Sequence, residues 1–204
     1  MQSIVTFSLI AITVLVSWQA FERPRLLERL ILWPPAIDRR KEFDRLITHG
    51  FIHADWQHLL FNMITLYFFG REVERMFTPY IGALGFVLFY LSAILVAILP
   101  TYLRHRHDPS YRSLGASGAV SAVLFAFILV NPWALIFVFF LPLPAILYAV
   151  LYIGYSIWMD KRGGDNINHS AHLSGAIYGV LFMLLMEPRV AGVFLQRLLN
   201  PSFG

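Results

Sequence analysis

Residues Ser113 to Val130 read SLGASGAVSAVLFAFILV, and this stretch decides the fold class. Its larger part is an apolar run of the kind that forms a membrane-crossing helix. Its start is a patch of small residues in which Ser117 stands between Gly115 and Gly118. Polar groups inside a membrane are costly unless they face the interior of a helix bundle or a wet cavity. The stretch therefore predicts a membrane helix that begins at a functional site.

The composition of the whole chain indicates an integral membrane protein. Of its 204 residues, 58% are hydrophobic and 14% are charged, and the mean hydropathy is +0.64, well above that of soluble domains. Apolar runs occur along the whole chain, whereas a signal peptide accounts for only one run near the start. The lipid bilayer is therefore the first expected partner.

Charge and cysteine content exclude several functions. The formal net charge is +4, but the basic residues are scattered beside acidic ones in loops, so nucleic acid is not an expected partner. The chain contains no cysteine, which excludes disulfides, thiolate metal sites and thiol nucleophiles.

Six apolar stretches are long enough, or nearly so, to cross a bilayer, which takes about 20 helical residues. Helix breakers separate them, mainly prolines and the stretch DKRGGDN. We therefore predict an all-α membrane protein with one domain over residues 1–204, six transmembrane helices and a long, partly structured first loop. Pro142 and Pro144 are available to kink the fifth helix. The expected spans cover approximately residues 4–20, 56–74, 80–99, 114–130, 133–159 and 169–186.

The unusual polar residues gather at one face of the expected bundle. Successive spans alternate in direction, so the second, fourth and sixth begin at the same side of the membrane. These three open with HADWQHLLFN, LGASG and INHSAHLSG. Taken alone, Ser117 is explained by a hydroxyl bonded within its own helix, and His172 by a structural imidazole with a satisfied partner.

Glycine spacing indicates a closer relation between these two residues. Gly175 and Gly179 follow His172 at i+3 and i+7, on one helical face, where glycine lets another helix approach closely. If that other helix is the one that carries Ser117, the hydroxyl and the imidazole come within hydrogen-bond distance. An adjacent base of this kind activates serine as a nucleophile.

The same region offers groups for stabilising an oxyanion. Ser117 lies near a helix N-terminus, where free backbone N–H groups favour a developing negative charge. His58 and Asn62 are spaced i, i+4 and can both donate hydrogen bonds; the alternative is a polar contact that holds helices together. A zinc site formed by His49, His53 and His58 is a further alternative, but the chain has no H-E-x-x-H motif. We therefore expect neither a metal nor a cofactor.

Together these motifs resemble those of the rhomboid intramembrane serine proteases, in particular bacterial members with a minimal six-helix core. HGFIHADWQHLLFNM resembles the family's second-helix motif, GASG its nucleophile motif and AHLSGAIYG its sixth-helix motif. The resemblance covers nearly the whole chain, in the family's order. It implies that Ser117 is the nucleophile and His172 the general base of a dyad without a third carboxylate. It also implies that the Ser117 backbone, His58 and Asn62 form the oxyanion hole.

The resemblance extends to positions outside the dyad. It implies that Arg45 holds the first loop and that Glu74 holds the far end of the second helix. Ser121 departs from the family, because some bacterial members carry a tyrosine there, stacked on the histidine; here that ring is missing or supplied from elsewhere. Thr78 stands where a glycine commonly follows the second helix, which predicts a different turn before Pro79.

The activity implied by the resemblance is cleavage of transmembrane segments, so other membrane proteins are the expected substrates. The alternative is a catalytically silent rhomboid-like protein that binds or escorts membrane clients. A transporter or proton channel is disfavoured, because no second polar cluster stands at the opposite face to complete a path. Nothing in the sequence indicates an oligomeric state.

Membrane orientation is the point on which the sequence and the resemblance disagree. The family's topology implies the inner membrane of the cell, a cytoplasmic N-terminus and an active site near the outer face. The loops of that outer face hold most of the Lys and Arg residues, so the positive-inside rule argues for the reverse. Acidic residues such as Glu28, Asp38 and Asp44 are interleaved with the basic ones in the first loop. On that ground we expect the family's orientation.

Overall fold

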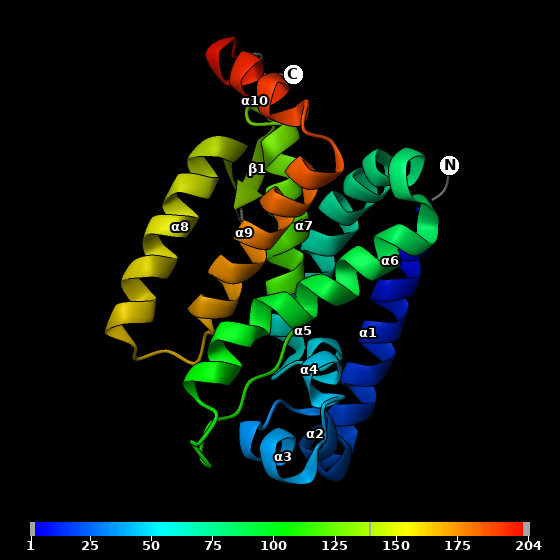
Figure 1. The fold of residues 1–204 in the computed structure, drawn as a ribbon, viewed down its shortest axis with the longest axis vertical. Helices are drawn as coiled ribbons and strands as arrows, with labels where there is room; N and C mark the ends of the chain where they lie inside the picture. The colour runs from blue at the N-terminus through cyan, green and yellow to red at the C-terminus, as the bar shows by residue number, and fades with distance from the viewer. Residues whose placement is uncertain (1–2, 139, 202–204) are drawn as a thin grey trace.

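The structure, a computed structural model, describes residues 3–138 and 140–201. It is mostly helical, and its long helices form one bundle with the short helices of the first loop at one end (Figure 1). The helical elements are α1 (Ile4–Glu22), α2 (Pro24–Leu30), α3 (Pro34–Arg40), α4 (Arg45–Thr48), the 3-10 turn η1 (His49–Phe51), α5 (Trp56–Thr65), the π-helical η2 (Leu66–Gly70), α6 (Arg71–Arg104), α7 (Ser117–Val130), α8 (Ala145–Arg162), α9 (His169–Met186) and α10 (Val190–Leu199).

Helix α7 lies at the centre of the bundle, with α6 and α9 packed against it (Figure 1). Every residue from Gly118 to Ala126 is buried, as expected for a helix that is apolar on all sides. Aromatic rings of α6 and α9 extend this core; Phe89 and Phe182, for example, have ring centroids 4.7 Å apart. The start of α7, with Ser117, is thereby packed between α6 and α9.

Three helical stretches of the described chain are long and apolar enough to cross a membrane: Ile4–Glu22, Trp56–Arg104 and His169–Met186. The second contains 49 residues, more than twice the roughly 20 that one crossing needs. It turns back at Gly82, where φ is +67°, a conformation that glycine adopts without the steric cost that a Cβ imposes. Its two halves therefore run in opposite directions (Figure 1).

The turn at Gly82 differs from the break expected at Pro79. The helix continues through Pro79 and reverses three residues later. The Thr78 hydroxyl donates to the carbonyl oxygen of Glu74 at 2.6 Å, within the helix that continues through the proline. The third expected span likewise runs past Pro100 to Arg104, because a proline interrupts the hydrogen-bond ladder without always ending it.

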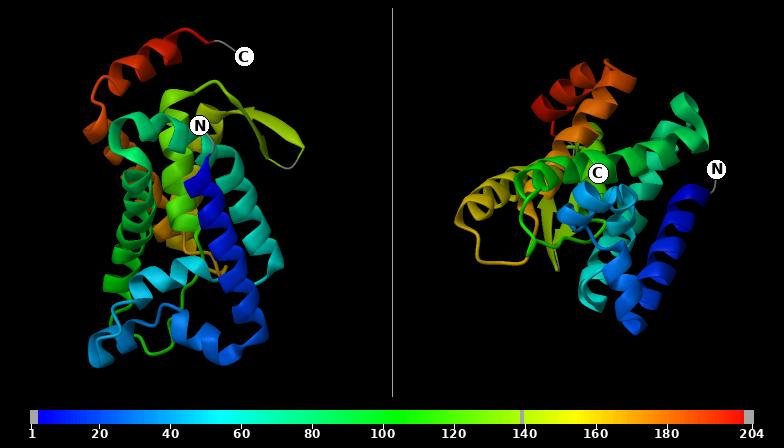
Figure 2. Two further views of the ribbon diagram at one scale, coloured as in Figure 1. Left: turned by 90° about the vertical axis from the view of Figure 1, so that its right-hand side faces the viewer. Right: turned by 60° about the horizontal axis from the view of Figure 1, so that its bottom comes forward.

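The expected helix over residues 133–159 is wrong in its first part. Strands β1 (Leu135–Val138) and β2 (Leu141–Pro144) pair antiparallel there, with Leu135 opposite Pro144. Pro142 and Pro144 lie within β2 and do not kink a helix, since α8 begins only at Ala145. Two prolines spaced by one residue remove backbone donors and favour extended neighbours. Figure 2 shows the hairpin at the end of the bundle opposite to the first loop, near α10.

Two further features of the helices differ from the sequence prediction. The fourth span was expected from residue 114, but α7 starts at Ser117 because Gly115, with φ +119°, is not helical. Helix α10 was not predicted at all. The first difference concerns an element end, where local contacts rather than apolar periodicity decide the conformation.

Two charged residues hold the ends of the bundle. Arg45 is buried in the first loop, where its guanidinium donates to Glu42 at 2.6 Å and to the carbonyl oxygens of Glu28 and Ile31, each at 2.7 Å. Glu74 lies at the other end. Its carboxylate accepts from the backbone N–H groups of Val5 and Thr6, at 3.0 and 2.7 Å.

The Glu74 carboxylate thus occupies the N-terminus of α1, where a negative charge satisfies free backbone donors and opposes the helix dipole. It joins α6 to α1. The sequence placed it at the far end of the second span, and its partner helix became visible only in three dimensions.

Candidate active site

Ser117 and His172 are brought together at the starts of two neighbouring helices. Ser117 is the first residue of α7, and His172 lies in the first turn of α9. The Nε2 atom of His172 is 2.7 Å from the Ser117 hydroxyl oxygen. Both side chains are partly exposed. The distance is within the range that a serine nucleophile and its base require.

Glycines allow the helices that carry this pair to touch backbone to backbone. A Cβ on Gly175 would overlap the carbonyl oxygen of Gly118, and a Cβ on Gly179 would overlap that of Ala122. Gly118 in turn faces the Cβ of Ala97 on α6. Helices in a membrane approach this closely only where small residues line the contact.

The segment before Ser117 is held by two histidines. The N–H of Gly115 donates to the carbonyl oxygen of His49 at 2.9 Å, and the N–H of Ala116 donates to Nε2 of His53 at 3.3 Å. The Nδ1 atom of His53 lies 3.0 Å from the Ser17 hydroxyl, which donates its own proton to the carbonyl oxygen of Phe51. Because Ser17 has only one proton, His53 must carry its hydrogen on Nδ1.

Burial keeps these two imidazoles neutral. It lowers the pKa of His53 to about 3 and the pKa of His49 to about 4, because the charged form loses its hydration. The Nδ1 atom of His49 lies 2.9 Å from the carbonyl oxygen of Arg45. The sequence alone suggests His49 and His53 only as zinc ligands, whereas both support the backbone before Ser117. Among the described residues, no three His, Asp or Glu side chains are grouped so that they could hold a metal ion.

His58 lies directly against the backbone before Ser117. A Cβ on Gly115 would come within 2.7 Å of Cε1 of the His58 ring, and the His58 ring meets that of His53 edge-on at 4.9 Å. Asp55 caps α5, the helix that carries His58, and accepts from the N–H of His58 at 2.7 Å. Asn62, one turn further, is buried and donates to the carbonyl oxygen of His58 at 2.9 Å. The second proton of its amide is available to another acceptor.

The part of the chain that holds this arrangement matches a known family. Residues 40–189 match the family model described as the Rhomboid domain. This chain belongs to the rhomboid family. The match runs from the last residue of α3 to the residues just after α9, and therefore includes Ser117, His172, His58 and Asn62.

This rhomboid is similar in sequence to proteins from plants and bacteria. It is 37% identical over 180 residues to "RHOMBOID-like protein 12, mitochondrial" of Arabidopsis thaliana, covering 80% of this chain and 52% of that one. It is 31% identical over 163 residues to "Rhomboid protease GluP" of Bacillus subtilis, covering 78% and 29%. It is 27% identical over 154 residues to "Rhomboid protease GlpG" of Haemophilus influenzae, covering 75% and 74%. This rhomboid thus spans about half of the plant relative's length and less of GluP's.

Asn168 joins three elements of this rhomboid just before α9. Its Oδ1 accepts from the N–H of Ala171 at 3.0 Å and from the Thr101 hydroxyl of α6 at 2.9 Å. Its Nδ2 donates to the hydroxyl of Ser113 at 3.1 Å. The start of α9 is therefore tied both to α6 and to the segment that leads into Ser117. The sequence analysis missed this residue, although an asparagine before a helix is a typical N-cap signal.

An aromatic ring lies beside the His172 imidazole, nearly parallel to it. The ring of Tyr152 on α8 stacks on it, with centroids 6.0 Å apart and planes 20° from parallel. The Tyr152 hydroxyl lies 2.7 Å from that of Ser121. A ring beside the histidine is thus present, and it comes from α8 rather than from the position of Ser121 on α7. The sequence had left open whether such a ring existed.

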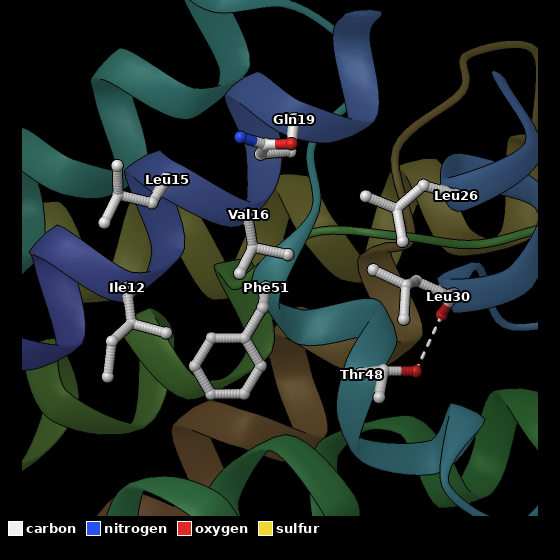
Figure 3. A pocket seen from close by; sticks show the side chains of 8 residues that line it. All are labelled: Ile12, Leu15, Val16, Gln19, Leu26, Leu30, Thr48 and Phe51. Atoms are coloured by element: carbon white, nitrogen blue, oxygen red, sulfur yellow. Dashed lines mark hydrogen bonds between the residues drawn. The ribbon is translucent and has the colours of Figure 1, made fainter. Parts of the chain in front are cut away.

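Two cavities lie at different distances from the pair. A cavity of about 440 Å³ lies between α1 and the first loop, and Figure 3 shows its walls. Neither Ser117 nor His172 lines it, and its walls are almost entirely apolar. A smaller cavity of about 10 Å³ borders Ser117 and has room for about one water molecule. The large cavity is therefore separate from the candidate active site.

Proposed function

We propose that this rhomboid is an intramembrane serine endopeptidase that cleaves transmembrane segments of other membrane proteins. The observation that carries the proposal is the 2.7 Å approach of His172 Nε2 to the Ser117 hydroxyl at the start of a buried helix. The names of GluP and GlpG as rhomboid proteases support it. No cofactor takes part in the proposed reaction.

In the proposed reaction, the Ser117 oxygen attacks the scissile carbonyl carbon while His172 takes the hydroxyl proton. The tetrahedral intermediate collapses, His172 gives the proton to the leaving amine, and an acyl-enzyme remains. Water then attacks the ester with His172 again as the base, which releases the new carboxylate and restores the serine. The backbone N–H of Ser117, together with the His58 and Asn62 side chains, stabilises the oxyanion.

The small residues have a role in this proposal. Gly115, with φ +119°, leaves the space that the His58 ring occupies. Gly118, Gly175 and Gly179 let α9 deliver the imidazole to Ser117. A substrate must present an extended backbone at this place, because a helical segment hides its carbonyls in hydrogen bonds. We therefore propose helix-destabilising residues and a small side chain at the cleavage site.

We further propose six membrane crossings, with the N-terminus in the cytoplasm, the site near the outer face, and the inner membrane of the cell as the location. Several basic residues on the site's side of the bundle are paired. Arg29 bonds to Asp44 at 2.7 Å, and Arg104 to Asp160 at 3.3 Å. The positive-inside rule counts Lys and Arg whether or not they are paired, so the proposed orientation follows the family's topology against that rule.

The test compares the wild type with Ser117→Ala and His172→Ala in detergent, on a model transmembrane substrate. Each change removes one member of the nucleophile–base pair, so we expect cleavage to fall by about 10³-fold or more. Ser8→Ala is the matched control, because Ser8 is exposed on α1 and bonds only within its own helix. Its cleavage should equal that of the wild type.

The outcomes separate the two candidate functions. Equal cleavage by Ser117→Ala and the wild type would remove the serine mechanism. If the wild type binds the substrate but neither cleaves it nor reacts with a fluorophosphonate probe, the protein is a silent rhomboid-like protein that binds or escorts membrane clients.

A further inference from the structure

Helix α8 faces the bundle with a single stripe of residues. The buried residues of α8 are Ala145, Ala149, Ser156 and Met159, and Tyr152 completes a spacing of four and three that marks one helical face. The other four side chains of this stripe are small or flexible. Tyr152 is therefore the one rigid ring that α8 directs at the bundle from this stripe.

This one side chain contacts both neighbouring helices. Its hydroxyl lies 2.7 Å from the Ser121 hydroxyl on α7, and its ring meets that of Phe125 on α7 with centroids 5.6 Å apart. Its ring also stacks on the His172 imidazole of α9 at 6.0 Å and 20°. The geometry is an offset stack of the kind that aromatic pairs favour.

The hydroxyl of Tyr152 contacts Ser121 and its ring contacts His172, so this one side chain links α7 to the imidazole. Ser121 lies one turn after Ser117 on α7, so its bond to the phenol fixes the height of the ring beside the Ser117–His172 pair. The stacked ring then limits rotation of the imidazole, whose Nε2 must stay aimed at the serine oxygen. Catalytic geometry depends on such support, since small misplacements of a base cost much of the rate.

We propose that Tyr152 is a positioning residue for His172 and also the latch that holds α8 against the bundle. The inference rests on the proposed protease function. Outward movement of α8 breaks the bond to Ser121 and withdraws the ring from the imidazole. The base is fully oriented only while α8 lies against α7 and α9.

The first test removes the ring with Tyr152→Leu. We expect kcat to fall about 10- to 100-fold with no rise in KM, because the base is disordered while the substrate path is intact. Labelling of Ser117 by a fluorophosphonate, which needs the base but no transmembrane substrate, should slow by the same factor. Trp158→Leu is the matched control: Trp158 is an exposed ring on α8, and it meets the ring of Tyr155 at 6.0 Å. It should change kcat less than threefold.

The second test keeps the ring and removes only its anchor. Tyr152→Phe and Ser121→Ala each delete the same hydrogen bond, so each should lower kcat about 3- to 10-fold. The double variant should be no worse than either single variant. Additive losses would show that the two hydroxyls act separately and would overturn the latch. Because both changes are conservative, these variants also serve if Tyr152→Leu fails to fold.

The outcomes distinguish this inference from the proposed function. If the wild type neither cleaves nor labels, the protease function itself is wrong. If the wild type is active and Tyr152→Leu labels at the wild-type rate, Tyr152 does not position the base, even if cleavage of the transmembrane substrate changes. A loss of kcat that is matched by the loss of labelling supports the proposal.

Discussion

His53 holds the backbone before Ser117 through a neutral imidazole. It is fully buried, and its Nε2 accepts from the N–H of Ala116. Protonation would remove that acceptor and place a charge in an apolar site. The ordinary pKa of histidine is near 6.5, whereas burial lowers the pKa of His53 to about 3.

This difference gives the stability of the fold a defined pH dependence. Between about pH 6.5 and 3, the unfolded chain binds a proton at this residue and the folded chain does not. The stabilisation is complete above pH 6.5 and is lost as the pH falls toward 3. We expect the free energy of unfolding in detergent to fall over this pH range by on the order of a few kcal/mol, which thermal unfolding at several pH values measures.

The variant His53→Gln tests this dependence. It should be less stable than the wild type at pH 7.5 but lose less on acidification, because one titrating group is gone. His107→Gln makes the same change at an exposed residue and should follow the wild-type curve. Identical pH slopes for His53→Gln and the wild type would contradict this role for His53.

At the scale of elements, the contact of α7 with α9 places His172 beside Ser117. Gly179→Ala would drive a methyl group into the carbonyl oxygen of Ala122, so the helices must separate. We expect a loss of about 1–3 kcal/mol in the free energy of unfolding and a large loss of cleavage, because the imidazole moves away from Ser117. Thermal unfolding and substrate cleavage in detergent measure the two effects.

Gly154→Ala is the control for this change. A Cβ on Gly154, in the middle of α8, would meet nothing within 4 Å, and alanine is a better helix former than glycine by up to about 1 kcal/mol. This variant should be as stable as the wild type or more so. If both glycine variants behaved alike, the close backbone contact would not be what holds the helices.

The β1–β2 hairpin shows how sequence prediction failed at this scale. Residues 133–144 form an apolar run, and an apolar run fits a helix and a buried strand alike. The sequence makes Pro142 and Pro144 available to kink a helix, whereas they belong to β2 and precede α8. Two prolines so close together argue against a helix, whereas the prediction of a helix rested on the hydrophobicity of the run.

At the scale of the whole molecule, the start of α1 and the end of α10 lie at the same end of the bundle (Figure 1). The proposed six crossings therefore put both ends in the cytoplasm. A reporter active only in the cytoplasm should be active after Gly204 and inactive when inserted at Gly163, in the loop between α8 and α9. The reverse pattern would invert the proposed orientation and follow the positive-inside rule instead.

The sequence by itself determined the membrane environment, the apolar stretches and the residues on which the proposed chemistry depends. Composition indicates that the chain lies in a lipid bilayer. Glycine spacing indicates which helix face can contact another helix, so Ser117, His172, Gly175 and Gly179 can be singled out from the printed chain. Only the tertiary structure decided what surrounds them. His53, Asn168 and Tyr152 act through partners that are distant along the chain, and such contacts exist only after the helices have packed.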